Sequence, residues 1–111
     1  MITTRQRLPN RRHAEHFDFE VAGLKYTATV GRFPDGRVGE VFLSTHRINS
    51  AADTNARDAA IACSIALQFG ADLETIRVGL SRDSQGRASG PLGAALDLIV
   101  SGEGGRDAQT A

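Results

Sequence analysis

The chain has 111 residues, of which 41% are hydrophobic and 23% charged, a composition typical of one soluble globular domain. Thirteen basic residues balance thirteen acidic ones, so net charge gives no general attraction to nucleic acid or to a membrane surface. No run approaches the roughly 18 apolar residues of a membrane helix, and the first residues lack the apolar segment of a secretory signal. A single cysteine cannot form an internal disulfide, which fits a reducing compartment. We therefore expect a cytoplasmic protein without membrane contact.

Basic charge is concentrated at the N-terminus, in a polar arm over residues 1–15. Four arginines lie in this arm: Arg5, Arg7, Arg11 and Arg12. A basic arm can bind phosphates or an acidic protein surface. The alternative is a solvated, partly disordered terminus, which the lack of interleaved aromatic residues for base stacking favours.

Three segments that follow the arm have the alternation or the β-forming residues of strands. They are 16–21, 24–30 and 38–44. The connections are short turns, and in the second of them Pro34 presets φ while Gly36 supplies a positive φ. Three strands joined in this way predict an antiparallel meander, which needs cover on one face.

The segment from Asp53 to Gly70 has the longest helical period in the chain. Its apolar residues recur every three or four positions and predict one broad apolar face. They are Ala56, Ala60, Ile61, Cys63, Ile65, Leu67 and Phe69. Ser50 or Asp53 is expected to cap the start of the helix, and Gly70 stands where a left-handed C-cap glycine belongs.

Two shorter helices are expected after this one, at 71–80 and from Pro91 to Gly102. Asp72 is a cap for the first, and Pro91 suits the first position of the second. Residues 103–111 are small and polar, which predicts a disordered tail. The expected fold is α+β, a single domain over residues 16–102 in which a three-stranded antiparallel meander is followed by three helices packed on one face of the sheet.

The polar loop at 81–90 is the best local candidate for a binding site. It runs into the start of the last expected helix, where free N–H groups and the positive end of the helix dipole favour an anion. The residues that would hold a nucleotide phosphate or an acidic peptide are Arg82, Ser84, Gln85, Arg87, Ser89 and Gly90. The glycine spacing matches no Walker or dinucleotide motif, and a flexible surface loop is the simpler interpretation.

No pattern in the sequence predicts a catalytic centre or a metal site. Cys63 lies on the apolar side of its helix, where free cysteine behaves as a small hydrophobe. The histidines match no recurring zinc spacing. Asp18, Glu20 and Glu40 alternate along strands, as charged residues on an open sheet face do. We expect no catalytic residue, no metal and no cofactor.

Several pieces of the chain together carry a family resemblance. They are Arg5–Arg12, Thr29–Gly31, Asp35-Gly36 with Gly39–Leu43, Ala60-Ile61 with Ser64–Gly70, Leu73-Glu74, and Pro91–Val100. In this order they resemble the C-terminal domain of adenosylcobalamin-dependent (class II) ribonucleotide reductases, often called the TSCPD domain. The resemblance covers most of the chain, from Arg5 to about Val100.

The resemblance implies an accessory domain related to DNA synthesis and not a reductase. In that family, a large α/β barrel upstream holds the cobalamin, forms a thiyl radical on one cysteine and reduces the ribose with a cysteine pair. Here Cys63 is the only cysteine, and the family's Cys-Pro-Asp motif and cysteine-rich tail are absent from the sequence.

Two functional hypotheses follow. The first is a non-catalytic binding or regulatory module that acts through protein–protein contact, with a reductase-like enzyme or as a homodimer. The second is a nucleic-acid or nucleotide-binding protein that uses the basic arm and the Arg82/Arg87 loop, and its binding would depend steeply on salt.

Overall fold

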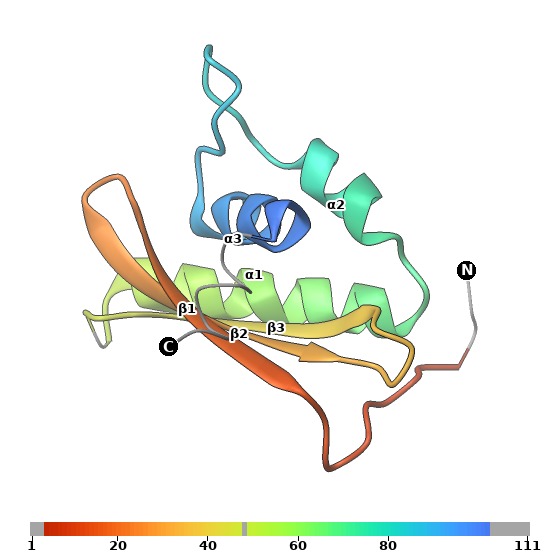
Figure 1. The fold of residues 1–111 in the computed structure, drawn as a ribbon. Coiled ribbons are helices and arrows are strands. Elements are labelled where there is room, and N and C mark those ends of the chain that lie inside the picture. Colours follow the sequence, from red (N-terminus) through yellow and green to blue (C-terminus); the bar gives the residue numbers. More distant parts are fainter. Residues whose placement is uncertain (1–3, 48, 103–111) are drawn as a thin grey trace.

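The computed structural model describes residues 4–47 and 49–102. Its elements are strands β1 (Ala14–Val21), β2 (Leu24–Arg32) and β3 (Val38–Thr45), then helices α1 (Ala51–Gln68), α2 (Leu73–Gly79) and α3 (Pro91–Ser101) (Figure 1). The strands pair antiparallel in the order β1-β2-β3. The predicted α+β fold is therefore confirmed. The tail at 103–111, expected to be disordered, lies outside the described residues.

Tight turns join the three strands. Ala22 and Gly23 both have positive φ, of 53° and 80°, which is the backbone of a two-residue hairpin whose twist matches that of the strands. The second turn closes where the N–H of Phe33 donates to the carbonyl of Arg37 at 2.8 Å, with Gly36 at φ 94°. The positive φ predicted for Gly36 is confirmed.

One face of the sheet is covered and forms the core. Its strand residues include Phe17, Tyr26, Ala28, Val30, Val41 and Leu43, and helix α3 contributes Leu92, Ala95, Leu96 and Ile99. Figure 1 shows α3 above the sheet and α2 farther out, beside α3. Because successive strand residues point to opposite faces, the residues between these lie on an open face.

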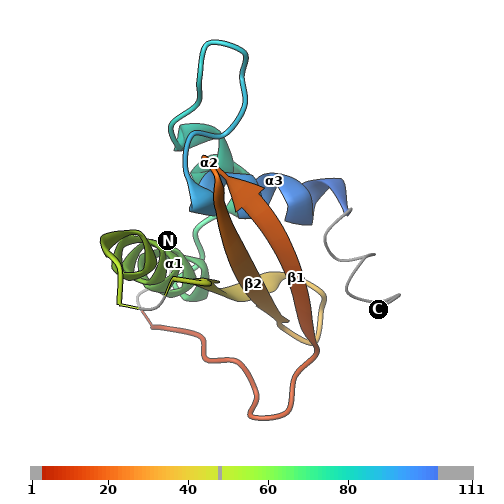
Figure 2. The same ribbon diagram turned by 90° about the vertical axis from the view of Figure 1, so that its left-hand side faces the viewer.

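Helix α1 runs along the outer edge of β3 and contacts that edge through polar side chains. The Ser64 hydroxyl accepts from the Val41 N–H at 2.8 Å and donates to the Val41 carbonyl at 3.0 Å. The Gln68 amide donates to the Gly39 carbonyl at 2.9 Å. Figure 2 shows α1 to one side of β1 and β2, not over them. The helix thus pairs an edge that would otherwise expose backbone groups.

Asp53 extends this edge contact to the start of the helix. Its carboxylate accepts from the Thr45 N–H at 2.9 Å and from the Arg57 guanidinium at 2.8 Å. These two partners, Thr45 first, hold the pKa of Asp53 below its ordinary value. Asp53 is not the helix cap, because the Ser50 hydroxyl takes that role and accepts from the Asp53 N–H at 3.1 Å.

The prediction of one broad apolar face on this helix is wrong for two residues. Ala56 and Ala60 are buried, but Ile61 is 49% exposed and Ile65 37% exposed. The side of the helix that meets β3 carries polar side chains. The apolar residues therefore lie on both sides of this polar strip, and only those on the core side are buried. The other two helices begin as expected, with Asp72 accepting from the Thr75 N–H at 3.1 Å and Pro91 at the first position of α3.

Candidate binding surfaces

The segment between α2 and α3, predicted as a phosphate-binding loop, folds into a small hairpin. Arg82 and Ala88 form an isolated antiparallel bridge. At the tip, the Asp83 carboxylate accepts from the N–H groups of Gln85 and Arg87, both at 2.9 Å. These bonds, that of Arg87 first, lower the pKa of Asp83. The loop is therefore ordered by its own acidic residue.

Arg82 is engaged inside the protein. Its guanidinium donates two hydrogen bonds to the Asp97 carboxylate, at 2.7 and 2.9 Å, and one to the Gly86 carbonyl at 3.0 Å. Arg77 donates to the same carboxylate at 2.9 Å. The Arg82 hydrogen bonds are the main reason that the pKa of Asp97 lies below its ordinary value. Arg82 thus ties the hairpin to α3, and its guanidinium N–H groups already donate to partners within the chain.

The remaining residues of the predicted loop site are spread along the hairpin. Ser84, Gln85 and Arg87 are exposed toward the tip, and Ser89 and Gly90 lie at the base, where Gly90 is the N-cap of α3. The six residues do not converge on one point. The anion site stays a prediction.

Part of the basic arm is tied to the domain. Arg5 donates to the Gln68 side chain at 2.5 Å, and Arg12 forms an ion pair with the buried Glu40. The half-buried Leu8 packs near Gly39, where a side chain on the glycine would collide with it. Two of the four predicted phosphate-binding arginines therefore have partners within the chain.

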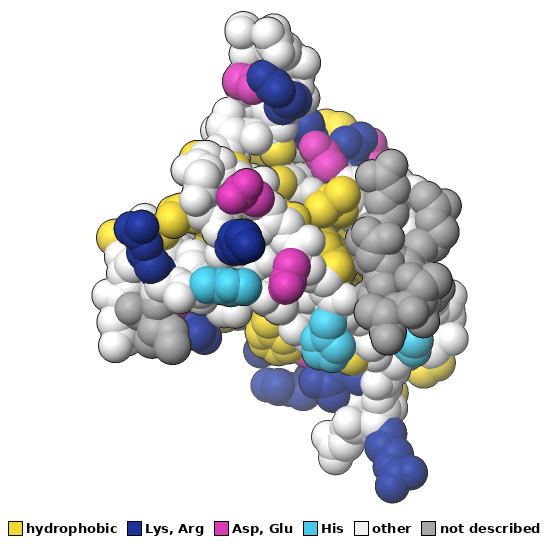
Figure 3. Space-filling model, turned by 60° about the vertical axis from the view of Figure 1, so that its left-hand side comes forward, with side chains coloured by type: hydrophobic (Ala, Val, Ile, Leu, Met, Phe, Trp, Pro, Cys, Tyr) yellow, Lys and Arg dark blue, Asp and Glu magenta, His cyan; other side chains and the backbone are white. Residues whose placement is uncertain are grey.

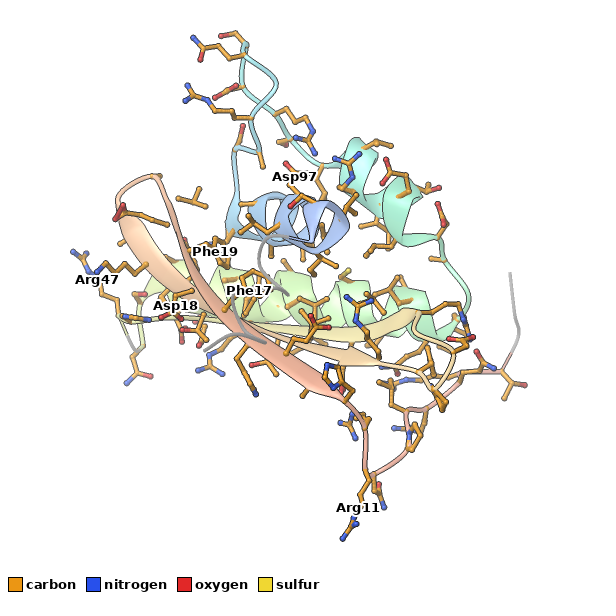
Figure 4. All side chains as sticks on the ribbon, viewed as in Figure 1. Arg11, Phe17, Asp18, Phe19, Arg47 and Asp97 are labelled. Carbon is orange, nitrogen blue, oxygen red and sulfur yellow. The ribbon has the colours of Figure 1, made fainter. Side chains whose placement is uncertain are left out.

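Arg7 and Arg11 are exposed, and neither has an ion-pair partner among the described residues. Arg11 points away from the body in Figure 4. In Figure 1 the arm and the α2–α3 hairpin lie at opposite ends of the molecule. The structure does not bring the two predicted basic segments together into one surface.

The open face of the sheet carries a polar network, where the alternating charges in the sequence predicted only a solvated face. The Thr27 hydroxyl donates to Asp18 at 2.7 Å and lies 3.2 Å from Nε2 of His46, which links β1 and β2 to the residue that follows β3. His16 Nδ1 lies 3.0 Å from the Thr29 hydroxyl. Figure 3 shows histidine, acidic and basic side chains interspersed on this side of the molecule. The charges alternate and form no surface of one sign.

Three exposed apolar side chains flank this network: Phe42, Ile61 and Ile65, here called the seam patch. Phe42 is 47% exposed, and it points to the open face because its neighbours in β3 are buried. On α1, Ser64 points at the β3 edge. The helical period places the buried residues of α1 on one side of Ser64 and the two isoleucines on the other side. The isoleucines therefore lie toward the open face of the sheet, where Phe42 is. The extra isoleucines of the helical period could have revealed this patch in the sequence.

The thiol of Cys63 is buried, and burial raises its pKa to about 11. Between residues 4 and 102, with Ile48 left aside, no group of three His, Cys, Asp or Glu side chains could hold a metal ion. Nor does any helix in those ranges have the length and apolarity to cross a membrane. The described residues thus present no reactive thiolate.

Comparison with known proteins finds related enzymes, three of which are described here. The vitamin B12-dependent ribonucleotide reductase of Agrobacterium fabrum is 40% identical over 70 residues, which are 63% of this chain and 6% of the enzyme. The corresponding reductase of Rhodopirellula baltica is 38% identical over 72 residues, 65% of this chain and 7% of the enzyme. The reductase of Bradyrhizobium diazoefficiens is 34% identical over 74 residues, which are 67% of this chain and 6% of the enzyme. The chain is a homologue of a short segment of these reductases.

The predicted resemblance is thereby confirmed. The chain spans about one-fifteenth of the length of these curated relatives, as a small accessory domain such as the C-terminal one would. No family model matches the chain, and no solved structure matches it.

Proposed function

We propose that this protein is a non-catalytic module that acts by binding another protein, and that its partner is a reductase-like enzyme. The observation that carries the proposal is the homology to only 6–7% of a vitamin B12-dependent ribonucleotide reductase. A segment of that size is an accessory part of a much larger enzyme. Such a segment contacts the rest of its own enzyme, and we expect a homologue of it to bind a reductase through similar surfaces.

The state of Cys63 supports a non-catalytic role. The radical chemistry that the resemblance implies needs thiols that can reach a substrate. Cys63 is buried and its pKa is raised to about 11, so the thiolate is scarce at neutral pH. No other cysteine is present in the sequence.

The seam patch is the surface that we expect to contact the partner. Large apolar side chains that are close together and ringed by polar groups are typical of protein interfaces. Two other exposed apolar residues, Val78 on α2 and Val100 on α3, lie on different elements. The seam patch holds three of the five large apolar side chains that are exposed among the described residues.

The experiment measures binding of the purified chain to the Agrobacterium fabrum reductase by biolayer interferometry. The Phe42→Glu and Ile61→Glu variants place a charge in the seam patch, and we expect each to weaken binding at least tenfold. Val78→Glu is the matched control, because Val78 is 58% exposed and lies on another helix. It should bind as the parent does.

Equal binding by all three variants would exclude the seam patch as the interface. A strict monomer in native mass spectrometry that captures no reductase would contradict the proposal itself. Turnover of ribonucleotides by the isolated chain would contradict the non-catalytic role.

A further inference from the structure

A cavity of about 370 Å³ opens between the first half of α1, the end of α2 and the start of α3. Its walls are apolar and come mainly from Ala52, Ala56 and Ala59 on one side and from Leu80 and Pro91 on the other. Figure 1 shows α1 and α3 starting at the same end of the molecule, one above the other. The volume falls within the range of small-molecule sites, about 300–1,000 Å³.

Tyr26 lies at the floor of this cavity and brings a free hydroxyl to it. The residue is only 5% exposed, and its ring stacks on Phe19 with centroids 5.6 Å apart. No described residue forms a hydrogen bond with the Tyr26 hydroxyl, although every fully buried side-chain polar atom in the described residues has a partner. The hydroxyl must therefore reach accessible space, and the cavity is the space that Tyr26 lines. A phenol hydroxyl that faces a cavity without a protein partner is a donor that a ligand can use.

The start of α3 supplies further donors to the same cavity. Its N-cap is Gly90, which has no side chain to accept from the first N–H groups, and Pro91 has no N–H. The N–H groups of Leu92 and Gly93 have no partner among the described residues, and both residues line the cavity. The other two helices differ, because Ser50 and Asp72 cap them with their side chains. The positive end of α3 is thus left open toward an acceptor.

The lining also limits what can bind. No arginine, lysine, aspartate or glutamate lines the cavity, and Asn55 and Ser81 are its other polar residues. A polyphosphate would find no cation to balance its charge. The residues that carry these donors line the same cavity, and its alanine and proline walls suit a compact apolar body.

We propose that this cavity binds a small monocarboxylate, with its carboxylate against the Tyr26 hydroxyl and the start of α3 and its apolar body between α1 and Leu80. The site does not depend on the proposed protein contact. The cavity lies on the core side of α1, whereas the seam patch lies on the opposite side of that helix.

The test uses cyclohexanecarboxylate as the probe, at pH 7. Tyr26 is the only tyrosine and the chain has no tryptophan, so tyrosine absorption and emission report on this site alone. The probe does not absorb in that range. We expect a saturable change in Tyr26 emission and matching shifts of the Leu92 and Gly93 amides in ¹H–¹⁵N spectra. Cyclohexylmethylammonium, which has the same ring and a cationic head, should give neither.

Two substitutions separate the hydroxyl from the cavity itself. Tyr26→Phe removes only the oxygen and should weaken binding of the probe about tenfold, as followed by the amide shifts. Ala59→Leu fills the cavity and should abolish the shifts. Ala62→Leu is its matched control, because Ala62 is exposed on the same helix and does not line the cavity. The control should bind as the parent does.

Three results would overturn the proposal: no saturable change with the carboxylate, an equal response to the ammonium compound, or unchanged affinity in Tyr26→Phe. If Ala59→Leu fails to fold, as amide dispersion would show, the Tyr26→Phe result and the choice between the two probes decide the matter. Loss of binding to the reductase would leave this result unaffected.

Discussion

Strands β3 and β1 are both edge strands of the same sheet, but the chain treats the two edges differently. The outward backbone groups of β3 meet side chains of α1, from Thr45 at one end to Gly39 at the other. The outward groups of β1 have no hydrogen-bond partner from a strand or a helix within the described residues. Hydrogen bonds from side chains of α1 close the β3 edge, whereas the β1 edge has no such cover.

The pairing pattern identifies the outward groups of β1. The Arg32 N–H donates to the His13 carbonyl, so alternate residues from His13 onward face β2. The backbone groups of His16, Asp18 and Glu20 therefore point away from the sheet. Two of these residues are acidic, and charged residues on an edge strand discourage pairing with another chain. A small sheet can thus protect one edge with a helix that packs along it and the other with charged side chains.

The Ser64 contact is the strongest test of the closed edge. Ser64→Ala removes the partner of both the Val41 N–H and the Val41 carbonyl at a buried position. We expect the free energy of unfolding to fall by about 2–3 kcal/mol, because a buried group left unpaired costs about 1–3 kcal/mol. Urea denaturation measures the change.

Ser44→Ala is the matched control for that variant. Ser44 lies on β3 but on the open face, and its hydroxyl has no hydrogen-bond partner among the described residues. Its loss should change stability by less than about 0.5 kcal/mol. Equal effects of the two substitutions would show that the edge contact contributes little.

The sequence predicted the sheet, the three helices and most caps, because strand alternation, turn glycines and helix-capping residues are local signals. It missed the edge contact, since Ser64 and Gln68 in a helical sequence look like ordinary solvent-facing residues. Their role depends on where β3 ends up, and no local pattern encodes that. The cavity was not predicted for the same reason. The sequence pattern indicates that Tyr26 is a core residue, and only the packing of α1 and α3 creates the space that Tyr26 lines.

The candidate loop site shows the converse difficulty. Arg82 and a helix start are adjacent in sequence, which suggested an anion site. The ion pair that occupies Arg82 comes from Asp97, fifteen residues later and on the next helix. Long-range partners of this kind decide whether a charged residue is available, and the sequence alone does not place them.

Acid should weaken the closed edge through Asp53. In the folded protein the pKa of Asp53 is lowered, chiefly by the Thr45 N–H and then by Arg57. The contribution of Asp53 to stability is therefore complete above the unfolded value, about 3.9, and is lost as the pH falls through the lower folded value. Unfolding curves between pH 7 and pH 2 measure the loss.

The Asp53→Asn variant sharpens this experiment. Its amide oxygen still accepts from the Thr45 N–H, but it does not titrate. We expect the variant to be less stable than the parent at pH 7, by less than Ser64→Ala, and to lose less stability on acidification. Parallel pH profiles for the two proteins would contradict a role for this carboxylate.

The open edge should respond least in stability and most in association. Replacing Asp18 and Glu20 together with valine removes the charges from the outward side of β1, while both positions stay on the exposed face. We expect the unfolding free energy to change by less than about 1 kcal/mol. The double variant should instead self-associate, because an apolar, unpaired strand edge is a template for another chain. Sedimentation velocity over a range of concentrations measures this.

Asp18→Lys with Glu20→Lys is the control, since it reverses the charge but keeps the edge charged and should sediment as the parent does. If the valine and lysine variants associate equally, charge is not what protects β1, and the contrast between the two edges must rest on the α1 contact alone.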